Sequence, residues 1–199
     1  MSRILDRLYH LHWVTPDVAR SAQPYLGFYP AFLAPHRFKG LINLRGENAD
    51  FGWWTTEKRV ASDLGIVHFD VKLSSRNLPS RSGLAALFEA FAGAQRPLLL
   101  KCSGGQDRTG LAAALYVLRL KGPGALPEAE AQLNSWPYLH FPKRHQLWLR
   151  HFPGYANAQA GAALSQWARD GYDPHHFAAW LEAKGLKGSY RAFQAEAVT

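Results

Sequence analysis

Cysteine is almost absent from this sequence of 199 residues: Cys102 is the only one, so the chain cannot form an internal disulfide bond. A lone thiol stays reduced and usable in a reducing compartment, and a cytoplasmic location is expected. The sequence also lacks a run of about twenty uncharged apolar residues, so no transmembrane segment is expected. Residues 1–6 lack the apolar segment of a signal peptide.

Acidic residues are scarce as well. The 15 Asp and Glu residues stand against 23 Lys and Arg residues, which gives a formal net charge of +8 and favours an anionic partner. The basic residues are scattered along the chain rather than collected on one helix with interleaved aromatics, so nucleic-acid binding is not expected. No zinc spacing of cysteines and histidines is present, and no metal site is expected.

A glycine-bearing loop between two apolar segments carries most of the information in the sequence. Residues 97–100 read as a short buried strand, and residues 111–120 read as a buried helix. This order points the free N–H groups and the positive end of the helix dipole at the loop, which favours a bound anion. Gly104 and Gly105 let the loop amides turn inward around it. The other residues expected to form this anion-binding loop are Ser103, Gln106 and Gly110.

Three residues of the loop predict nucleophilic chemistry on phosphorus. Cys102 opens the loop, where a helix N-terminus and a nearby cation lower the pKa of a thiol. Arg108 follows across the loop, and its planar guanidinium can hold two oxygens of a phosphoryl group. Thr109 can donate a hydroxyl hydrogen bond to the thiolate or help expel it. Cys102, Arg108 and Thr109 are therefore expected catalytic residues.

The pattern Cys-x5-Arg-Thr resembles the signature loop of the cysteine-based protein tyrosine and dual-specificity phosphatases. Residues 17–24 and 41–45 resemble the opening strands of small atypical dual-specificity enzymes, so the resemblance covers about residues 12–150. It implies an α/β fold with a central, mostly parallel sheet flanked by helices. It also implies a phosphocysteine intermediate and no metal or other cofactor. The chain is expected to form one phosphatase-like domain, residues 1–199, with residues 151–199 as a helical C-terminal extension.

The residue that protonates the leaving oxygen is open in the sequence. Most of the family uses an aspartate on a separate loop, about thirty residues before the cysteine, and Asp70 lies 32 residues before Cys102. However, residues 66–73 alternate like a strand with Asp70 in its middle, and the following loop, residues 74–80, contains no carboxylate. Asp107 is the preferred acid, because the order Cys-Ser-x-Gly-x-Asp-Arg-Thr resembles the loop of myotubularin-type phosphoinositide phosphatases. A site without a dedicated acid is the third alternative.

Other parts of the chain have weaker signals. Paired short strands are expected in residues 12–14 and 17–21, a strand in residues 40–44, and helices in residues 55–64, 82–94 and 126–133. Arg45 follows a strand and is a candidate contact at the rim of the site, with a structural salt bridge as the alternative. Arg76 is a second candidate contact, with a solvated side chain as the alternative. Trp53 and Trp54 are adjacent and cannot both face one core; core packing is the preferred expectation, and the alternative places one of them at the mouth of the active site.

These observations predict a hydrolase, a cysteine-dependent phosphatase that acts on phosphotyrosine or phosphoserine/threonine proteins. One alternative is a phosphoinositide or small phosphate-ester phosphatase, which Asp107 and the positive charge favour. Another is a phosphate-binding module with weak turnover, which the carboxylate-free loop favours. A sulfurtransferase also uses a loop cysteine after a strand, but the Arg-Thr pair that closes this loop argues against it.

Overall fold

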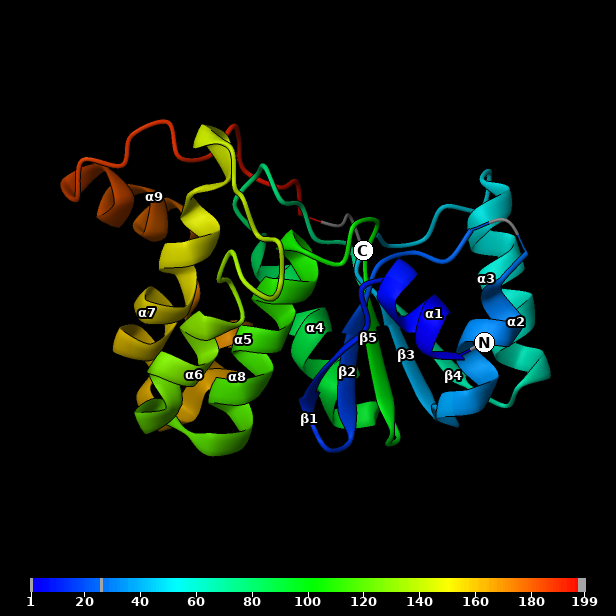
Figure 1. Cartoon of the computed structure of the whole chain (residues 1–199). Coiled ribbons are helices and arrows are strands. Elements are labelled where there is room, and N and C mark those ends of the chain that lie inside the picture. Colours follow the sequence, from blue (N-terminus) through cyan, green and yellow to red (C-terminus); the bar gives the residue numbers. More distant parts are fainter. Residues whose placement is uncertain (1, 26, 197–199) are drawn as a thin grey trace.

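A five-stranded sheet lies at the centre of the computed structural model, which describes residues 2–25 and 27–196 (Figure 1). The strand order is β1-β2-β5-β3-β4; β1 pairs antiparallel with β2, and the other three pairings are parallel. The strands are β1 (His12–Thr15), β2 (Val18–Ser21), β3 (Gly40–Asn43), β4 (Val67–Asp70) and β5 (Leu98–Lys101). The predicted α/β class with a mostly parallel sheet is confirmed.

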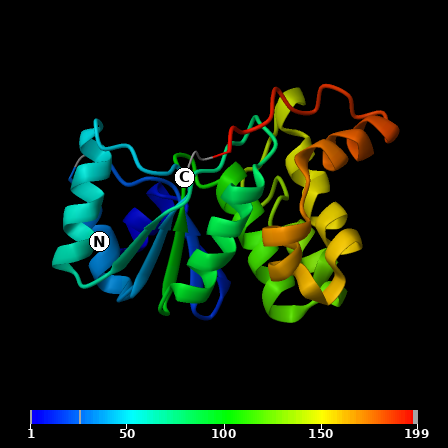
Figure 2. The ribbon, with the colours of Figure 1, turned by 180° about the vertical axis from the view of Figure 1, so that it is seen from behind.

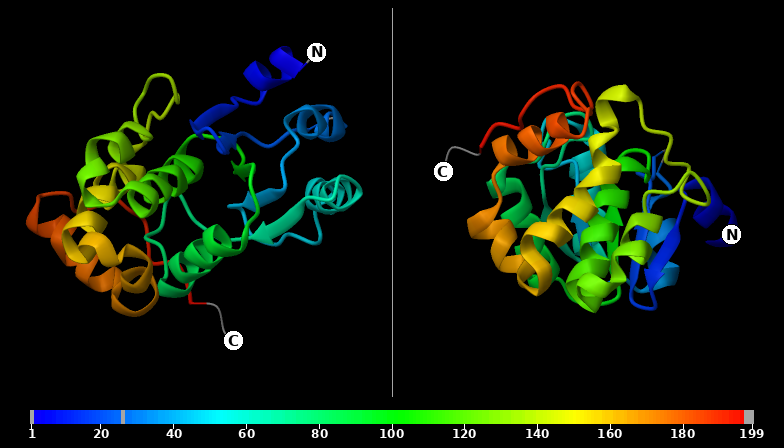
Figure 3. Two further views of the ribbon diagram at one scale, coloured as in Figure 1. Left: turned by 90° about the horizontal axis from the view of Figure 1, so that it is seen from below. Right: turned by 90° about the vertical axis from the view of Figure 1, so that its left-hand side faces the viewer.

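One face of the sheet is covered by helices from the first third of the chain, seen on the right in Figure 1 and again from below in Figure 3. These helices are α1 (Ser2–Leu8), α2 (Tyr29–Leu33) and α3 (Gly52–Asp63), with a 3-10 turn at Ala34–His36. Their apolar side chains form a core with Ala19, Leu41 and Leu99 of the three central strands. This small core fixes the N-terminal segment against the sheet.

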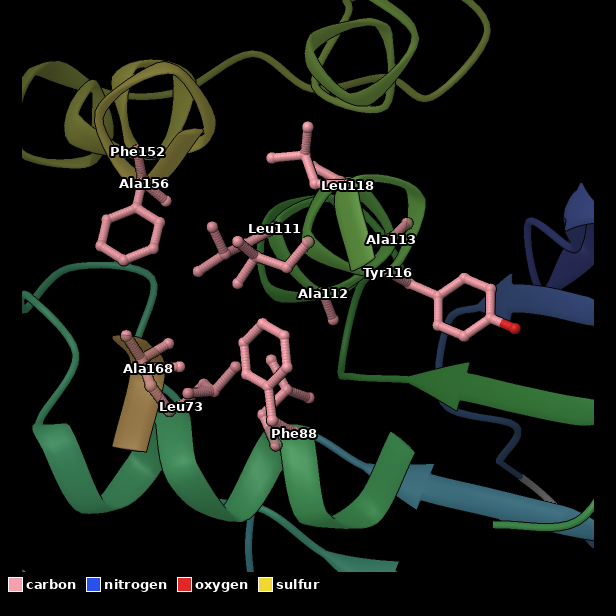
Figure 4. Close-up of a cluster of buried hydrophobic side chains, with 14 of the residues drawn as sticks. Leu73, Phe88, Leu111, Ala112, Ala113, Tyr116, Leu118, Phe152, Ala156 and Ala168 are labelled. Carbon is pink, nitrogen blue, oxygen red and sulfur yellow. The ribbon is translucent and has the colours of Figure 1, made fainter. Parts of the chain in front are cut away.

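The opposite face carries α4 (Arg81–Gly93) and α5 (Asp107–Lys121), and further helices pack outside these two. The outer helices are α6 (Leu126–Ala131), α7 (Trp148–Ala160), α8 (Leu164–Gln166) and α9 (Pro174–Ala183), joined by 3-10 turns at Pro123–Ala125, Arg144–Gln146 and Gly161–Ala163 and a π turn at Trp167–Gly171. Figure 4 shows how Phe88 of α4, Leu111 of α5 and Phe152 of α7 point into one cluster. This shared core supports the single-domain organisation, which stays a prediction.

Local sequence explains where the helices of this second face begin and end. Helix α5 is apolar almost all round because it lies between the sheet and the outer helices, and Gly122 ends it with a φ of 81°. The Ser80 hydroxyl caps α4 by accepting a hydrogen bond from the backbone N–H of Gly83. Asp173 caps α9 by accepting a hydrogen bond from the backbone N–H of His175, with Pro174 in the first helical position.

The parallel strands bring their carboxyl ends to one edge of the sheet, so the loops that follow β2, β3, β4 and β5 meet there. The C-terminal segment crosses the same edge, as Figure 2 shows. Its backbone pairs with the loop after β4: Leu78 donates to Ala192 at 2.9 Å, and Gln194 donates to Leu78 at 2.9 Å. None of the helices in the described ranges has the length and apolar character that crossing a membrane requires.

Three details differ from the sequence-based expectations. Strand β4 ends at Asp70, so this aspartate is the last residue of the strand and not a mid-strand residue. The helix expected from residue 55 begins three residues earlier, at Gly52. Core packing of Trp53 and Trp54 is wrong: both indoles are half-buried, because they lie in the first turn of α3 at the open edge of the sheet.

Candidate active site

Cys102 lies at the bottom of the loop between β5 and α5, and its thiol is buried. The backbone N–H of Gly105 donates a hydrogen bond to Sγ at 3.3 Å, and the Thr109 hydroxyl lies 4.0 Å from Sγ. Gly105 has a φ of 68°, a conformation that favours glycine, and this turn directs its N–H inward. The loop therefore has the inward-facing amide that an anion site requires.

The pKa of the Cys102 thiol is lowered overall. Burial is the largest single influence on this pKa and acts in the opposite direction, because it raises the pKa. The positive charge of Arg108 lowers the pKa, and so do the backbone hydrogen bonds from Thr109 and Gly105 and the hydroxyl of Thr109. Together these influences outweigh the burial. The thiol consequently has the environment of a nucleophile, because the thiolate is the reactive form.

The rest of the loop surrounds the space above the sulfur. Arg108 is half-buried and donates from Nη2 to the Ser103 hydroxyl at 2.8 Å. Gly104 is exposed at the top of the loop, and the Gln106 carbonyl accepts from the backbone N–H of Gly110 at 2.9 Å at the start of α5. The structure thus brings together all the residues that the sequence predicts for this loop.

Arg20 of β2 supports the loop from below, and sequence reasoning missed it. Its buried guanidinium donates to the carbonyl oxygens of Gly105 at 3.1 Å, Gln106 at 2.8 Å and Gln132 at 2.6 Å. Burial lowers the pKa of Arg20 to about 10. A signal was present in the sequence: Arg20 is the one charged residue of the short strand Val18–Ser21.

A second buried group lies below the mouth of the site and was also missed. Lys101, directly before Cys102 in the chain, forms an ion pair with Glu57 of α3, and both side chains are fully buried. Lys101 donates to Gln23 Oε1 at 2.6 Å, and Tyr29 donates to Glu57. The available signal was a lysine at the end of the apolar strand 98–101, since a lysine buried there requires a partner.

The loops at the carboxyl edge enclose a cleft of about 690 Å³ over the anion loop. Four basic side chains line it, and the one carboxylate among the described residues that line it is Asp107. The basic residues come from the loops after β3 and β4 and from α5, and they are Arg45, Lys72, Arg76 and Arg108. Both candidate rim contacts, Arg45 and Arg76, therefore lie in the cleft.

Arg45 is held at the rim by neutral groups. Its guanidinium stacks on the Trp53 ring at 3.5 Å from the ring centroid, and it donates to Gln23 Oε1 at 3.3 Å and to the Tyr25 hydroxyl at 3.5 Å. Within residues 2–25 and 27–196, no carboxylate forms an ion pair with it. The salt-bridge alternative for Arg45 thus has no partner in the structure.

Asp107, the first residue of α5, lies in the cleft wall beside the loop. His140 Nδ1 is 3.0 Å from Oδ1 of Asp107, and Gln146 Nε2 donates to Oδ2 at 2.9 Å. The Asp107 side chain is 24% exposed and the His140 side chain is fully buried. Both partners belong to the segment between α6 and α7, and neither was expected from the sequence to contribute to the site.

Asp70, the other candidate acid, does not line the cleft. Its Oδ1 accepts hydrogen bonds from Asn43 Nδ2 at 2.7 Å and from Trp54 Nε1 at 3.0 Å. Its Oδ2 is 3.9 Å from Lys58 Nζ. These bonds give Asp70 a role in joining β3, β4 and α3. In the described parts of the chain, no group of three or more His, Cys, Asp and Glu residues is placed to hold a metal ion.

Known protein families include one whose model matches the segment around the anion loop. Residues 58–123 match the model of the tyrosine phosphatase family, a segment that includes Cys102 and Arg108. The resemblance to cysteine-based phosphatases is thereby confirmed. No curated protein matches the sequence.

Solved structures of phosphatases share the fold. The DUF442 phosphatase from Shewanella putrefaciens CN-32 is 19% identical with a TM-score of 0.56, over 76% of this chain and 93% of that one. A mutant form of Tk-PTP is 15% identical with a TM-score of 0.55, over 75% of this chain and 97% of that one. PTPMT1 in complex with PI(5)P is 16% identical with a TM-score of 0.54, over 76% of this chain and 99% of that one. The fold is therefore of the dual-specificity phosphatase type.

Proposed function

We propose that this protein is a cysteine-dependent phosphatase that hydrolyses phosphate monoesters through a phosphocysteine on Cys102. The observation that carries the proposal is the buried Cys102 thiol with a lowered pKa, below an inward N–H of Gly105 and beside the guanidinium of Arg108. In this mechanism the thiolate attacks phosphorus while the ester oxygen leaves with a proton. Water then attacks the phosphocysteine, which releases phosphate and restores the thiolate.

Each of the other loop residues has a part in this reaction. Arg108 holds two nonbridging oxygens of the phosphoryl group and neutralises their charge as the P–O bond breaks. Thr109 stabilises the thiolate when it is expelled in the second step. Asp107 is the proposed acid in the first step and the base that activates water in the second, because it is the carboxylate of the cleft wall.

The primary test is hydrolysis of p-nitrophenyl phosphate followed by trapping of the intermediate with a denaturant at alkaline pH. The wild type should release phosphate and carry one phosphoryl group on the protein, whereas Cys102→Ser should do neither. Because Cys102 is the only cysteine, a phosphocysteine has a single possible position. Arg108→Lys should lose about 100-fold or more in kcat/KM, and Arg119→Lys, near the other end of α5, is the matched control. A wild type that binds phosphate esters and releases no phosphate is a binding module and not an enzyme.

Phosphotyrosine and phosphoserine/threonine proteins are the proposed substrates, in keeping with the family. A phosphoinositide or another small phosphate ester is the second candidate, and the charge of the cleft favours it. The four basic side chains of the cleft form no ion pairs with carboxylates of the described residues. A substrate with more than one phosphate group can therefore neutralise more of these positive charges than a phosphate monoester can. The test compares phosphotyrosine peptides with phosphoinositide head groups in the wild type and in Arg76→Met. A head-group substrate should lose kcat/KM in Arg76→Met, while p-nitrophenyl phosphate should not.

A further inference from the structure

His140 and Asp107 form a hydrogen-bonded pair at the back of the cleft wall. The distance from Nδ1 to Oδ1 is 3.0 Å, and the imidazole is fully buried, whereas Asp107 remains partly open to the cleft. The other ring nitrogen, Nε2, is buried and has no hydrogen-bond partner among the described residues. Asp107 is therefore the polar group that holds this ring in place, and the ring in turn fixes Oδ1.

The second oxygen of Asp107 is fixed as well. Gln146 Nε2 donates to Oδ2 at 2.9 Å and to the Ser75 hydroxyl at 3.2 Å. The orientation of this amide is determined by its own oxygen, which accepts from the backbone N–H of Lys143 at 3.1 Å. Gln146 lines the cleft and His140 does not. The oxygen bonded to Gln146 is thus the one on the side of the cleft.

The segment that provides both partners is itself anchored to the second layer of helices. The His140 carbonyl accepts from Arg150 Nη2 of α7 at 3.1 Å and from the Ser135 hydroxyl at 3.3 Å. The backbone around the imidazole is therefore held independently of Asp107. A positioning residue requires such an independent anchor, because its imidazole must stay in place when the Asp107 carboxyl gains or loses its proton.

We propose that His140 is the positioning residue of the acid Asp107: it binds Oδ1 and leaves Oδ2 to give its proton to the leaving oxygen. The proposal rests on the proposed phosphatase function. His140 does not touch the cleft, so it acts through Asp107 and not on the substrate. A mutation that displaces a catalytic group by about 1 Å lowers the rate on the order of 100-fold.

Dependence on the leaving group separates this role from a purely structural one. A general acid matters most when the leaving oxygen is basic, as in phenyl phosphate, and least when it is a stable phenolate, as in p-nitrophenyl phosphate. Both esters place an aromatic ring and a phosphate in the cleft. Loss of the Asp107 proton should therefore lower kcat/KM for phenyl phosphate far more than for p-nitrophenyl phosphate.

The experiment compares four variants on these two substrates. Asp107→Asn and His140→Phe should each lose roughly 100-fold in kcat/KM with phenyl phosphate and less than about threefold with p-nitrophenyl phosphate. His140→Asn should recover much of the loss, because the Asn amide nitrogen takes a position close to Nδ1. His36→Phe is the matched control, since His36 pairs with Asp6 at 2.8 Å outside the cleft and should leave both rates unchanged.

Three results would overturn the positioning proposal and leave the phosphatase function intact. A His140→Phe enzyme that loses the same factor on both substrates has a general folding or binding defect, which vanadate binding and thermal unfolding would also reveal. A leaving-group effect in Asp107→Asn without one in His140→Phe shows that the acid is positioned without the imidazole. No effect in Asp107→Asn shows that Asp107 is not the acid, with the phosphatase function intact. A wild type that hydrolyses neither ester refutes the phosphatase function itself.

Discussion

Replacement of Gly105 by alanine tests whether the shape of the anion loop controls the thiol. A Cβ atom at this position would lie 2.5 Å from the backbone nitrogen of Ala22 and 2.7 Å from the carbonyl carbon of Ser21. The φ of 68° costs alanine about 1–2 kcal/mol, and overpacking costs about 1–3 kcal/mol more. The free energy of unfolding should fall by about 2–5 kcal/mol, which lowers Tm by about 4–20 °C in a protein of this size.

The same change should also alter the chemistry of Cys102. Relief of the clash moves the Gly105 N–H away from Sγ, and loss of that hydrogen bond raises the pKa of the thiol. The rate of alkylation by iodoacetamide, measured against pH, should therefore have its midpoint at a higher pH in Gly105→Ala than in the wild type. Calorimetry gives the accompanying change in Tm.

Gly104→Ala is the control for both measurements. Its Cβ would meet nothing closer than Gln106 Oε1 at 3.8 Å, and its φ lies outside the left-handed region. This variant should keep the Tm and the alkylation profile of the wild type. If Gly105→Ala behaves like Gly104→Ala, the link between the Gly105 turn and the thiolate is refuted.

Three further changes have defined outcomes. Lys101→Met should lower the free energy of unfolding by about 3–5 kcal/mol, because it leaves the buried Glu57 carboxylate without its cation; chemical denaturation should show recovery when Glu57→Gln is added. Asp70→Asn should keep kcat/KM for phenyl phosphate within about threefold of wild type, since the acid contributes about 100-fold or more and Asp70 lies outside the cleft. Burial, with the charges of His10 and Arg20, lowers the pKa of His12 from 6.5 to about 4. The unfolded chain therefore binds more protons between these values, so Tm should fall as pH decreases from 6.5 to 4, and less steeply in His12→Asn.

The sequence predicts the anion loop well because its residues are contiguous. Residues 102–110 form one turn and the first turn of a helix, so local geometry alone places Cys102, Gly105 and Arg108 around one point. The central strands are predictable for a similar reason: each is a short apolar run, and parallel strands bring their following loops to one edge. The same argument makes Arg45 a candidate for the rim, with a structural salt bridge as the alternative.

Residues that act across long stretches of the chain were not predictable in this way. Arg20 precedes the carbonyl of Gly105 by 85 residues, and His140 follows Asp107 by 33. A single sequence contains no information on which distant side chains meet behind a loop. Burial of Trp53 shows the same difficulty: a large ring favours the core, but this one stacks on the Arg45 guanidinium at the rim, which was the alternative expectation.

The position of Asp107 changes what the enzyme requires of its loops. An acid on a separate loop must be brought to the leaving oxygen by that loop, whereas Asp107 is fixed at the start of α5 beside Arg108. The carboxylate-free loop, residues 74–80, is correspondingly tied down, because Leu78 pairs with the C-terminal segment on both its N–H and its carbonyl, and Ser75 is bonded to Gln146. If Asp107 is the acid, proton delivery needs no loop closure, and the C-terminal third of the chain is a structural part of the catalytic site.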